Sequence, residues 1–263
     1  MVVLNGYKAV KDGIITHSEE VSGRPLTPFY RDMMGEKGIF LTSGHTWKQQ
    51  RRFGMTVIRT LALGKNNLEH QIQAEACILI QVVGRKIKYF HFSAEKVQRE
   101  IEAVLEPSHL ISYEDRKKLP YTNAVIHEAL RYSNVTSVGV LRQCVRNTTL
   151  LGFHIKKGTL VLPNLHSVVY DSEHWATPWK FNPNHFLDLD GNFVNKEAFL
   201  PFSAGHRVCL GEQMARVELF IFFTNLLRAF RFQLPEGVKE INLEYILGSI
   251  LQPHPYKLCA IPR

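Results

Sequence analysis

The order of hydrophobic and polar residues along the chain follows two periods, which predicts a mainly α fold with small β-sheets (α+β). The apolar start of the segment over residues 2–7 predicts a short strand that runs into a turn, and residues rich in glycine, proline, serine and threonine over 22–46 predict a loop. The pattern is lost over residues 81–93. Helical spacing predicts helices over residues 8–20, from about residue 46, and over 68–79, 94–105, 120–132 and 212–230.

Two of these helices carry a specific expectation about burial. Val97, Ile101 and Val104 share one face of the segment 94–105, which predicts an amphipathic helix buried on that face. The segment 212–230 is apolar almost all round, which predicts a buried helix.

The remaining strands are predicted from alternation and turn residues. Residues 148–162 alternate in hydrophobicity and turn at Lys157 and Gly158, which predicts a hairpin. The tail, residues 241–263, predicts short strands with Pro253 and Pro255 in turns.

Composition narrows the classes of function. The chain has 263 residues, of which 45% are hydrophobic and 21% charged, so it can bury a sizeable core and is not disordered as a whole. The formal net charge of +8 favours an acidic protein, an anionic membrane surface or nucleic acid as partner. The basic residues are dispersed and form no nucleic-acid motif, so we expect no nucleic-acid partner. Four cysteines without a CxxC pair favour reduced thiols.

The strongest chemical signal is a ten-residue segment directly before the last predicted helix. Cys209 lies where the helix dipole and free amide groups lower the pKa of a thiol. Glycines on both sides permit close approach of the backbone to a flat ligand or to the sulfur. A lone cysteine is more often a buried structural residue, but this spacing favours a ligand. The fixed residues of the segment are Phe202, Gly205, Arg207, Cys209 and Gly211.

Two further pairs stand at helical spacing. Glu128 and Arg131 are three residues apart and share a helix face with apolar neighbours. They form an ion pair if that face is buried, and an exposed helical pair is the alternative. Trp47 and Arg51 are four residues apart, so they share a helix face. This spacing is typical of an aromatic ring that covers an arginine stem on a surface helix.

Together these residues resemble the microsomal cytochromes P-450 of family 2, most closely subfamily J, which are haem-thiolate monooxygenases. The segment around Cys209 matches the family signature Phe-x-x-Gly-x-Arg-x-Cys-x-Gly at every fixed position. The resemblance implies an incomplete P-450 fold with an N-terminal part at 1–80 and a junction at 81–93. A C-terminal haem-binding part at 94–263 holds the J, K and L helices of the family.

The resemblance also implies roles for single residues. The Cys209 thiolate binds the iron of haem b as its axial ligand. Glu128 and Arg131 lock the core together with His185, the third partner, from a Phe-x-Pro-x-x-Phe loop. The other haem-binding positions of the family fall on Trp47, Arg51, Arg142, Phe202, Gly205, Arg207 and Gly211.

Two parts of the family's sequence have no counterpart in this chain: the N-terminal membrane anchor and the central region from the D to the I helix. The I helix carries an Ala/Gly-Gly-x-Asp/Glu-Thr motif, whose acid–alcohol pair delivers protons to bound dioxygen. No catalytic residue of that kind is therefore expected here. The family implies the cytosolic face of the endoplasmic reticulum membrane, and the missing anchor implies a cytosolic or peripheral protein.

The implied activity is oxidation of lipophilic substrates, such as arachidonate and other fatty acids or xenobiotics, with dioxygen. Electrons come from NADPH through NADPH-cytochrome P-450 reductase, or from a cytochrome b-type donor. The basic residues Lys48, Arg52 and Arg216 are candidates for docking an acidic reductase. The alternative is a catalytically inactive truncated isoform that binds haem or reductase without turnover, or that does not fold.

Overall fold

The chain forms two compact units, each assembled from separate stretches of sequence. The computed structural model describes residues 1–34, 37–62, 67–86, 95–242, 244–248 and 250–263. Both units combine helices with small sheets, so the expected fold class is confirmed. The first unit comprises Met1–Thr60, Leu130–Phe181 and Lys196–Glu212, and the second comprises Leu61–Ala129, Asn182–Asn195 and Gln213–Arg263.

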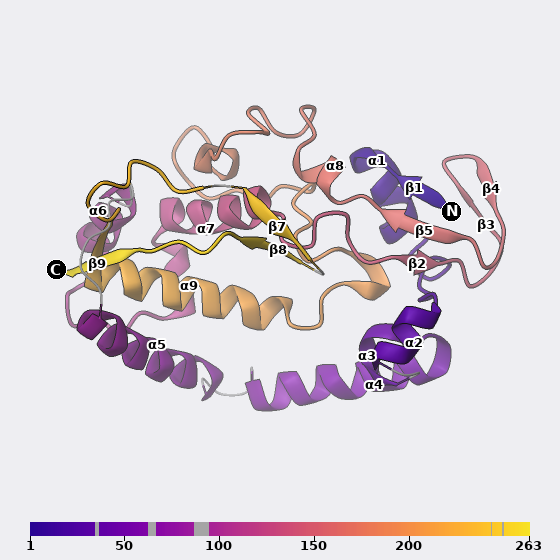
Figure 1. Cartoon of the computed structure of the whole chain (residues 1–263), viewed down its shortest axis with the longest axis horizontal. Coiled ribbons are helices and arrows are strands. Elements are labelled where there is room, and N and C mark those ends of the chain that lie inside the picture. The colour runs from indigo at the N-terminus through magenta and orange to yellow at the C-terminus, as the bar shows by residue number, and fades with distance from the viewer. Residues whose placement is uncertain (35–36, 63–66, 87–94, 243, 249) are drawn as a thin grey trace. The chain divides into compact units, whose positions relative to one another are not determined.

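The first unit contains a three-stranded sheet in the order β1–β5–β2 (Figure 1). β1 (Val2–Leu4) runs parallel to β5 (Leu160–Pro163), and β2 (Arg142–Gln143) runs antiparallel to it. Arg142 is opposite Val161, and both side chains are buried. The sheet therefore carries a guanidinium group into the interior of the unit.

Helices precede and follow the strands of this sheet along the chain. The predicted loop over 22–46 is wrong in two places, because α2 and α3 form within it. Pro28 begins α2, where its fixed φ suits the first helical turn and its missing N–H would have no acceptor. The helices of this unit are α1 (Gly6–Lys11), which continues as a π-helix over Asp12–Thr16, α2 (Pro28–Met34), α3 (Gly38–Leu41), α4 (Gly44–Val57) and α8 (His166–Val169).

The predicted hairpin forms with a different pair of strands. β3 (Thr148–Leu150) pairs antiparallel with β4 (Phe153–Ile155). Leu151 and Gly152 between them have φ of 47° and 87°, the left-handed pair that suits a two-residue hairpin turn. The chain turns again at Gly158, but the strand that follows is β5, which pairs with β1 and β2. The predicted return strand is wrong because β5 finds its partners far away in sequence.

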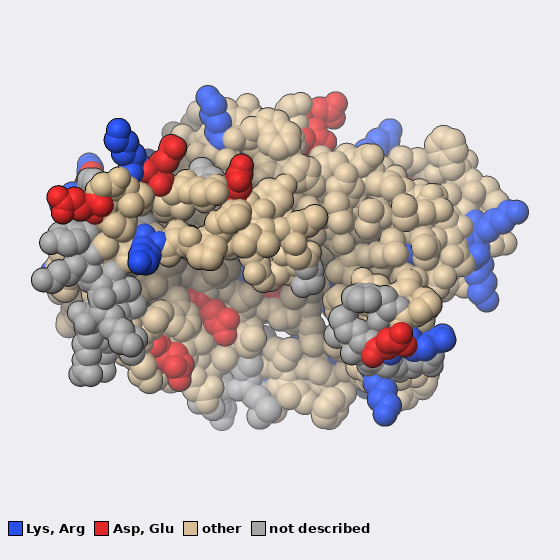
Figure 2. Space-filling view, viewed as in Figure 1, with Lys and Arg blue, Asp and Glu red and all other residues tan. Residues whose placement is uncertain are grey.

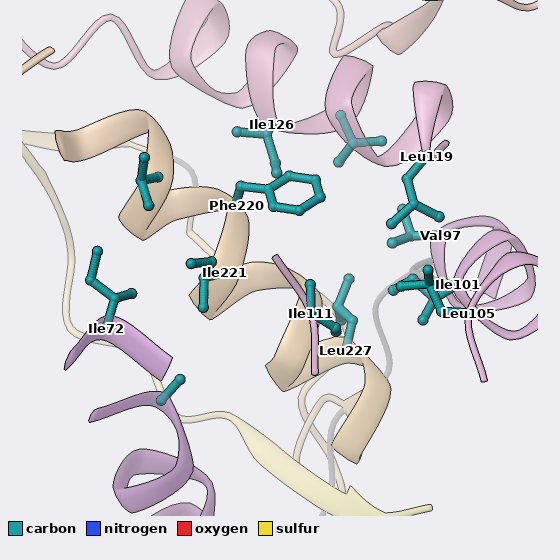
Figure 3. Close-up of a cluster of buried hydrophobic side chains, with 13 residues drawn as sticks. Ile72, Val97, Ile101, Leu105, Ile111, Leu119, Ile126, Phe220, Ile221 and Leu227 are labelled. Carbon is teal, nitrogen blue, oxygen red and sulfur yellow. The ribbon is translucent and has the colours of Figure 1, made fainter. Parts of the chain in front are cut away.

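The core of the second unit lies between helices (Figure 3). Ile126 of α7 lies against Phe220 of α9, and Ile72 of α5 and Ile101 of α6 belong to the same buried cluster. The helices are α5 (Asn67–Lys86), α6 (Glu95–Val104), α7 (Pro120–Ser133) and α9 (Glu212–Ala229), of which α7 ends and α9 begins in the first unit.

Two helix predictions need correction in detail. α5 continues past residue 79 to Lys86, so the first part of the predicted junction is helical, and residues 87–93 lie outside the described residues. On α6, Val104 is 42% exposed, whereas Gln98 is 5% exposed. The Gln98 Nε2 donates to the carbonyl oxygens of Leu227 and Phe230 at 3.1 and 2.9 Å. A polar residue thus takes the buried face because backbone carbonyls at the end of α9 accept from it.

The C-terminal strands form two separate pairs. β6 (Phe230–Gln233) pairs antiparallel with β9 (Cys259–Pro262), and β7 (Tyr245–Leu247) pairs antiparallel with β8 (Leu251–Pro253). Short strands were expected in this tail, but Pro253 ends strand β8 instead of lying in a turn. A proline is tolerated at a strand end because no ladder hydrogen bond needs its missing N–H.

Asp115 should make the stability of the second unit depend on pH. Its Oδ2 accepts from the amide and hydroxyl of Ser112 at 2.8 and 2.9 Å and lies 2.8 Å from His109 Nε2. Burial raises the pKa of Asp115, but these hydrogen bonds outweigh burial and lower the pKa to about 2. A carboxyl group with a depressed folded-state pKa stabilises the fold above its unfolded value of about 3.9 and loses this contribution as the pH falls through about 2.

We therefore expect Asp115 to contribute roughly 2 kcal/mol at pH 5, lost between about pH 4 and pH 2. Urea unfolding of the wild type and of Asp115→Asn across that range measures the contribution as the gap between the two curves. The exposed Asp190→Asn is the control. A gap that stays constant from pH 5 to pH 2 would contradict the assignment.

Charged residues are dispersed on the surface in view. Figure 2 shows lysine, arginine, aspartate and glutamate side chains scattered over this face instead of gathered in one patch of a single sign. Within the described part of the chain, no helix has the length and apolar composition needed to cross a bilayer.

Candidate functional site

The segment with the predicted iron ligand lies in the first unit and leads into α9. A 3-10 helix over Gly205–Arg207 precedes Cys209, and α9 begins at Glu212. The Cys209 amide donates to the carbonyl oxygen of Phe202 at 3.0 Å. This bond closes the segment into a loop, in which the Cys209 side chain is exposed. Ser203 within the loop has a φ of 61°, an uncommon value for a residue with a side chain.

Gly205 holds this loop against the π-helix Asp12–Thr16. Its φ is 69°, and a Cβ at this position would overlap the carbonyl oxygen of Ile14 and lie 2.7 Å from Cβ of Ser18. A glycine is therefore needed at position 205 because the backbone of another segment lies too close for a side chain. Gly211 differs, because a Cβ there would meet no described atom within 4 Å.

Gly205→Ala should lower the free energy of unfolding by about 2 kcal/mol or more, because it adds backbone strain and a clash with another segment. Gly211→Ala, two residues beyond Cys209, is the matched control and should stay within about 1 kcal/mol. Urea unfolding of the chain without haem measures both. Equal losses for the two variants would show that the contact with Ile14 is unimportant.

Arg142 is a deeply buried cation of this unit. Its side chain is 1% exposed, and its Nη2 donates to Ser203 Oγ at 2.9 Å and to the carbonyl oxygen of Ala204 at 3.2 Å. Among the described residues, Nε and Nη1 have no hydrogen-bond partner. Burial, and then the charges of Arg24 and Arg207, lower the pKa of Arg142 to about 9. Burying a charged guanidinium group costs free energy unless a nearby anion balances its charge.

Arg24 belongs to the same cluster but was not predicted from the sequence. Its Nη1 donates to the carbonyl oxygens of Val140 and Leu141 at 3.1 and 2.8 Å, and its Nε donates to that of Phe40. Burial lowers the pKa of Arg24 to about 10. Arg24 lies in a glycine- and proline-rich segment without helical or strand periodicity, so no local pattern marks it.

Arg207 and Arg51 both lie against the ring of Trp47. The guanidinium carbon of Arg207 is 4.0 Å from the centroid of the buried Trp47 ring, and that of Arg51 is 5.7 Å away. Arg207 also donates to the carbonyl oxygens of Ser22 and Thr42 at 2.7 and 2.6 Å. Burial and the charges of Arg24 and Arg51 lower the pKa of Arg207 to about 9. The predicted Trp47–Arg51 pair therefore belongs to a larger arginine cluster.

A cavity of about 270 Å³ lies among these side chains. None of the four arginines forms an ion pair with any part of the chain that the structure describes. Apolar residues and the Cys209 thiol complete the wall, so the cavity suits a largely apolar ligand with more than one negative charge. Its lining includes Arg24, Arg51, Arg142, Arg207, Trp47, Phe202, Cys209, Phe40, Val140 and Leu165.

Glu128 and His185 come together in the second unit, as the sequence predicts. Glu128 is fully buried, its Oε1 accepts from the Asn182 amide at 2.7 Å, and its Oε2 lies 3.2 Å from His185 Nδ1. Arg131, one helical turn later on α7, is also fully buried. In the first unit it donates to the carbonyl oxygens of Val169, Pro178 and Lys180 at 2.7, 2.8 and 3.1 Å. The exposed-pair alternative for Glu128 and Arg131 is wrong, because both side chains are in the interior.

Two of the basic residues predicted for a partner lie on one surface of the first unit. Lys48 and Arg52 line a shallow depression of about 530 Å³, together with Arg51 and His206. Lys48 forms an exposed ion pair with Glu19 at 3.2 Å. The third predicted residue, Arg216, belongs to the second unit and lines a different cavity there.

Comparisons with known proteins show the family of this chain. A family model described as Cytochrome P450 matches residues 1–89 and 93–260. Cytochrome P450 2K4 of Oncorhynchus mykiss is 50% identical, over 100% of this chain and 83% of the relative. Cytochrome P450 2J2 of Homo sapiens is 28% identical, over 100% and 82%. Cytochrome P450 2J1 of Oryctolagus cuniculus is 50% identical, over 64% and 33%. The chain therefore belongs to the cytochrome P450 family, and its relatives place it in family 2.

The relatives contain internal sequence that this chain does not match. The alignment with the trout relative covers all of this chain and runs over 419 residues, whereas the chain has 263. The two segments matched by the family model are separated by residues 90–92, which lie inside the predicted junction at 81–93. Relatives of subfamilies K and J reach equal identity over different lengths, so the nearest subfamily stays a prediction.

Proposed function

We propose that this chain binds haem b in the cavity of the first unit, with the Cys209 thiolate as axial ligand, and that it functions as a haem-thiolate monooxygenase. The observation that carries the proposal is the buried Arg142, whose Nε and Nη1 have no partner among the described residues, in a cavity that Cys209 also lines. Haem is the cofactor of this family, and its two propionates are the anions that such a cluster needs.

Each side chain of the cavity has a distinct task in this proposal. Arg142 and Arg24, with Arg51 and Arg207, bind the propionates, and Ser203 Oγ orients Arg142. Trp47 packs under two of these guanidinium groups and fixes their planes. When bound, haem with a thiolate ligand supplies the activation of dioxygen. The protein residues position the group and neutralise its carboxylates.

Arg142→Met tests the proposed binding site. We expect haem affinity to fall about tenfold or more, because a charge-assisted bond to a propionate is lost. The same variant without haem should be more stable by roughly 1–3 kcal/mol, because an uncompensated buried charge is replaced by an apolar side chain of similar length. The opposite signs of the two effects separate ligand binding from a structural role.

Absorbance titration with haemin and urea unfolding without haem measure the two effects. The control is Arg146→Met, which removes an exposed arginine that pairs with Glu20 at 2.6 Å. It should leave haem affinity unchanged. An Arg142→Met variant that binds haem like the wild type would remove the main support for this site.

We propose haem binding without turnover as the second candidate function. It is favoured by the internal sequence that the relatives have and this chain does not match. The acid–alcohol motif that delivers protons in the family occurs nowhere in the sequence. Haem-loaded chain with NADPH, reductase and arachidonate distinguishes the candidates. Product that contains oxygen from dioxygen supports the monooxygenase, and a normal haem spectrum without product supports binding alone.

The proposed electron donors are NADPH-cytochrome P-450 reductase and a cytochrome b-type protein. The depression lined by Lys48 and Arg52 offers basic side chains to an acidic donor. Lipophilic compounds, such as fatty acids or xenobiotics, are the proposed substrates. The proposed location is the cytosolic face of the endoplasmic reticulum membrane, or the cytosol beside it.

A further inference from the structure

A second cavity lies wholly within the second unit and has a different chemistry. Its volume is about 510 Å³, and it opens between the 3-10 helix Tyr113–Lys117, the first half of α7, the loop at 192–195 and the first turns of α9. Three cations, Arg116, Lys117 and Arg216, line it. No carboxylate residue is among its described lining residues, whereas three asparagines are. None of its lining residues belongs to the proposed haem site. One of them, Arg216, is a residue that the sequence suggested for docking a reductase.

The two guanidinium groups of this cavity are held in place from behind. Arg116 Nη1 donates to the Tyr113 carbonyl oxygen at 2.6 Å, and its guanidinium carbon is 4.0 Å from the centroid of the Tyr113 ring. Arg216 Nη1 lies 2.9 Å from Nε2 of His127. Both groups are therefore oriented before any ligand binds, which reduces the entropy cost of binding.

His127 orients Arg216 without adding a charge. Its Nδ1 lies 2.8 Å from the carbonyl oxygen of Asn123, so Nδ1 carries the proton and Nε2 accepts from Arg216. Burial, and to a lesser degree the charge of Arg216, lowers the pKa of His127 to about 4. Arg116 and Lys117 both pair with Glu114. The Glu114 side chain is exposed and is not among the described residues that line the cavity.

We propose that this cavity is a binding site for a small polyanion with a diphosphate group. Cations line the cavity from the 3-10 helix and from α9, and Asn192 and Asn195 line it from a third segment, where Asn192 Nδ2 also donates to Asp188 Oδ2 at 3.2 Å. Donors on several sides suit the tetrahedral oxygens of phosphate, and guanidinium groups bind such oxygens in pairs. A concave site of this size also favours an enclosed small ligand over the flat surface of a protein partner.

Inorganic pyrophosphate is the probe for this site. We expect the full-length chain, without added haem, to bind it saturably at one site in isothermal titration calorimetry at low salt. The affinity should fall as sodium chloride is raised, because partly exposed charges are screened. Arg116→Gln should weaken binding about tenfold, and Lys117→Gln should weaken it several-fold, in line with the loss of charge-assisted bonds.

Lys118→Gln is the matched control, because Lys118 is the next residue and is exposed but does not line the cavity. It removes the same charge and should change the affinity less than twofold. Circular dichroism of each variant verifies that the fold is retained. Absence of saturable binding would overturn the proposal. An equal loss for Lys118→Gln would also overturn it, because it would show general attraction to a basic surface. Binding of a poly-glutamate peptide but not of pyrophosphate would assign the cavity to an acidic protein segment instead.

Discussion

Cys209→Ala is expected to abolish the reduced carbon-monoxide difference band that is typical of thiolate-ligated haem. Among the described cysteines, Cys209 is the one that lines the cavity with the four arginines. Cys144 and Cys259 are buried, and burial raises the pKa of both thiols, which disfavours the thiolate that a metal needs. The variant should still take up haem, because the arginines that bind the propionates remain.

The expected signature is therefore a change of spectrum with much of the haem content retained. Cys77→Ala is the matched control, since Cys77 is also exposed but belongs to α5 in the second unit. It should keep the thiolate band. A Cys209→Ala variant with an intact band would show that another residue binds the iron. A wild-type chain that takes up no haem would refute the proposed function as a whole, and the pyrophosphate site would remain to be tested separately.

Glu128→Ala should cause the largest loss of stability of any single substitution considered for this chain. The change leaves the Asn182 amide without its carboxylate acceptor and removes the buried partner of His185. Removing one member of a buried, hydrogen-bonded pair costs about 3–5 kcal/mol. Glu128→Gln keeps an acceptor for the Asn182 amide and should therefore cost less than Glu128→Ala.

Urea unfolding followed by far-ultraviolet circular dichroism measures this loss, because the second unit that contains Glu128 is rich in helices. Glu95→Ala provides the comparison: it removes an exposed carboxylate that pairs with Arg99 at 3.2 Å on α6. It should cost less than about 1 kcal/mol. If Glu128→Ala loses no more than Glu95→Ala, the buried network around Glu128 does not stabilise the fold.

The correct and incorrect fold predictions separate by the range of the interactions involved. The helices α6, α7 and α9 were predicted with ends correct to a residue or two, because helical hydrogen bonds and side-chain periodicity are local. The place of β5 was missed, because β5 pairs with β1, which lies more than a hundred residues earlier. The burial of Gln98 was missed for the same reason, since its acceptors are the carbonyl oxygens of Leu227 and Phe230.

The candidate site divides in the same way. The segment around Cys209 was singled out by its residue spacing together with its match to the family signature, and the prediction that Glu128 meets His185 came from family motifs that can be read in order along the chain. Arg24 was overlooked, since nothing in its local sequence distinguishes it from any other loop arginine. The sequence also could not predict that Nε and Nη1 of Arg142 have no partner among the described residues. Whether a buried donor finds an acceptor depends on every group around it in the folded chain.

Family membership, the thiol at Cys209 and the helix that follows it can thus be read from residues a few positions apart, where backbone geometry sets the spacing of side chains. The charge of the cavity cannot. Its four arginines stand at positions 24, 51, 142 and 207, and only the packing of the first unit brings them together in a cavity with no carboxylate residue in its described lining. Once these guanidinium groups are buried, they need an anionic ligand. Removing a charge from water costs free energy unless an opposite charge replaces the water.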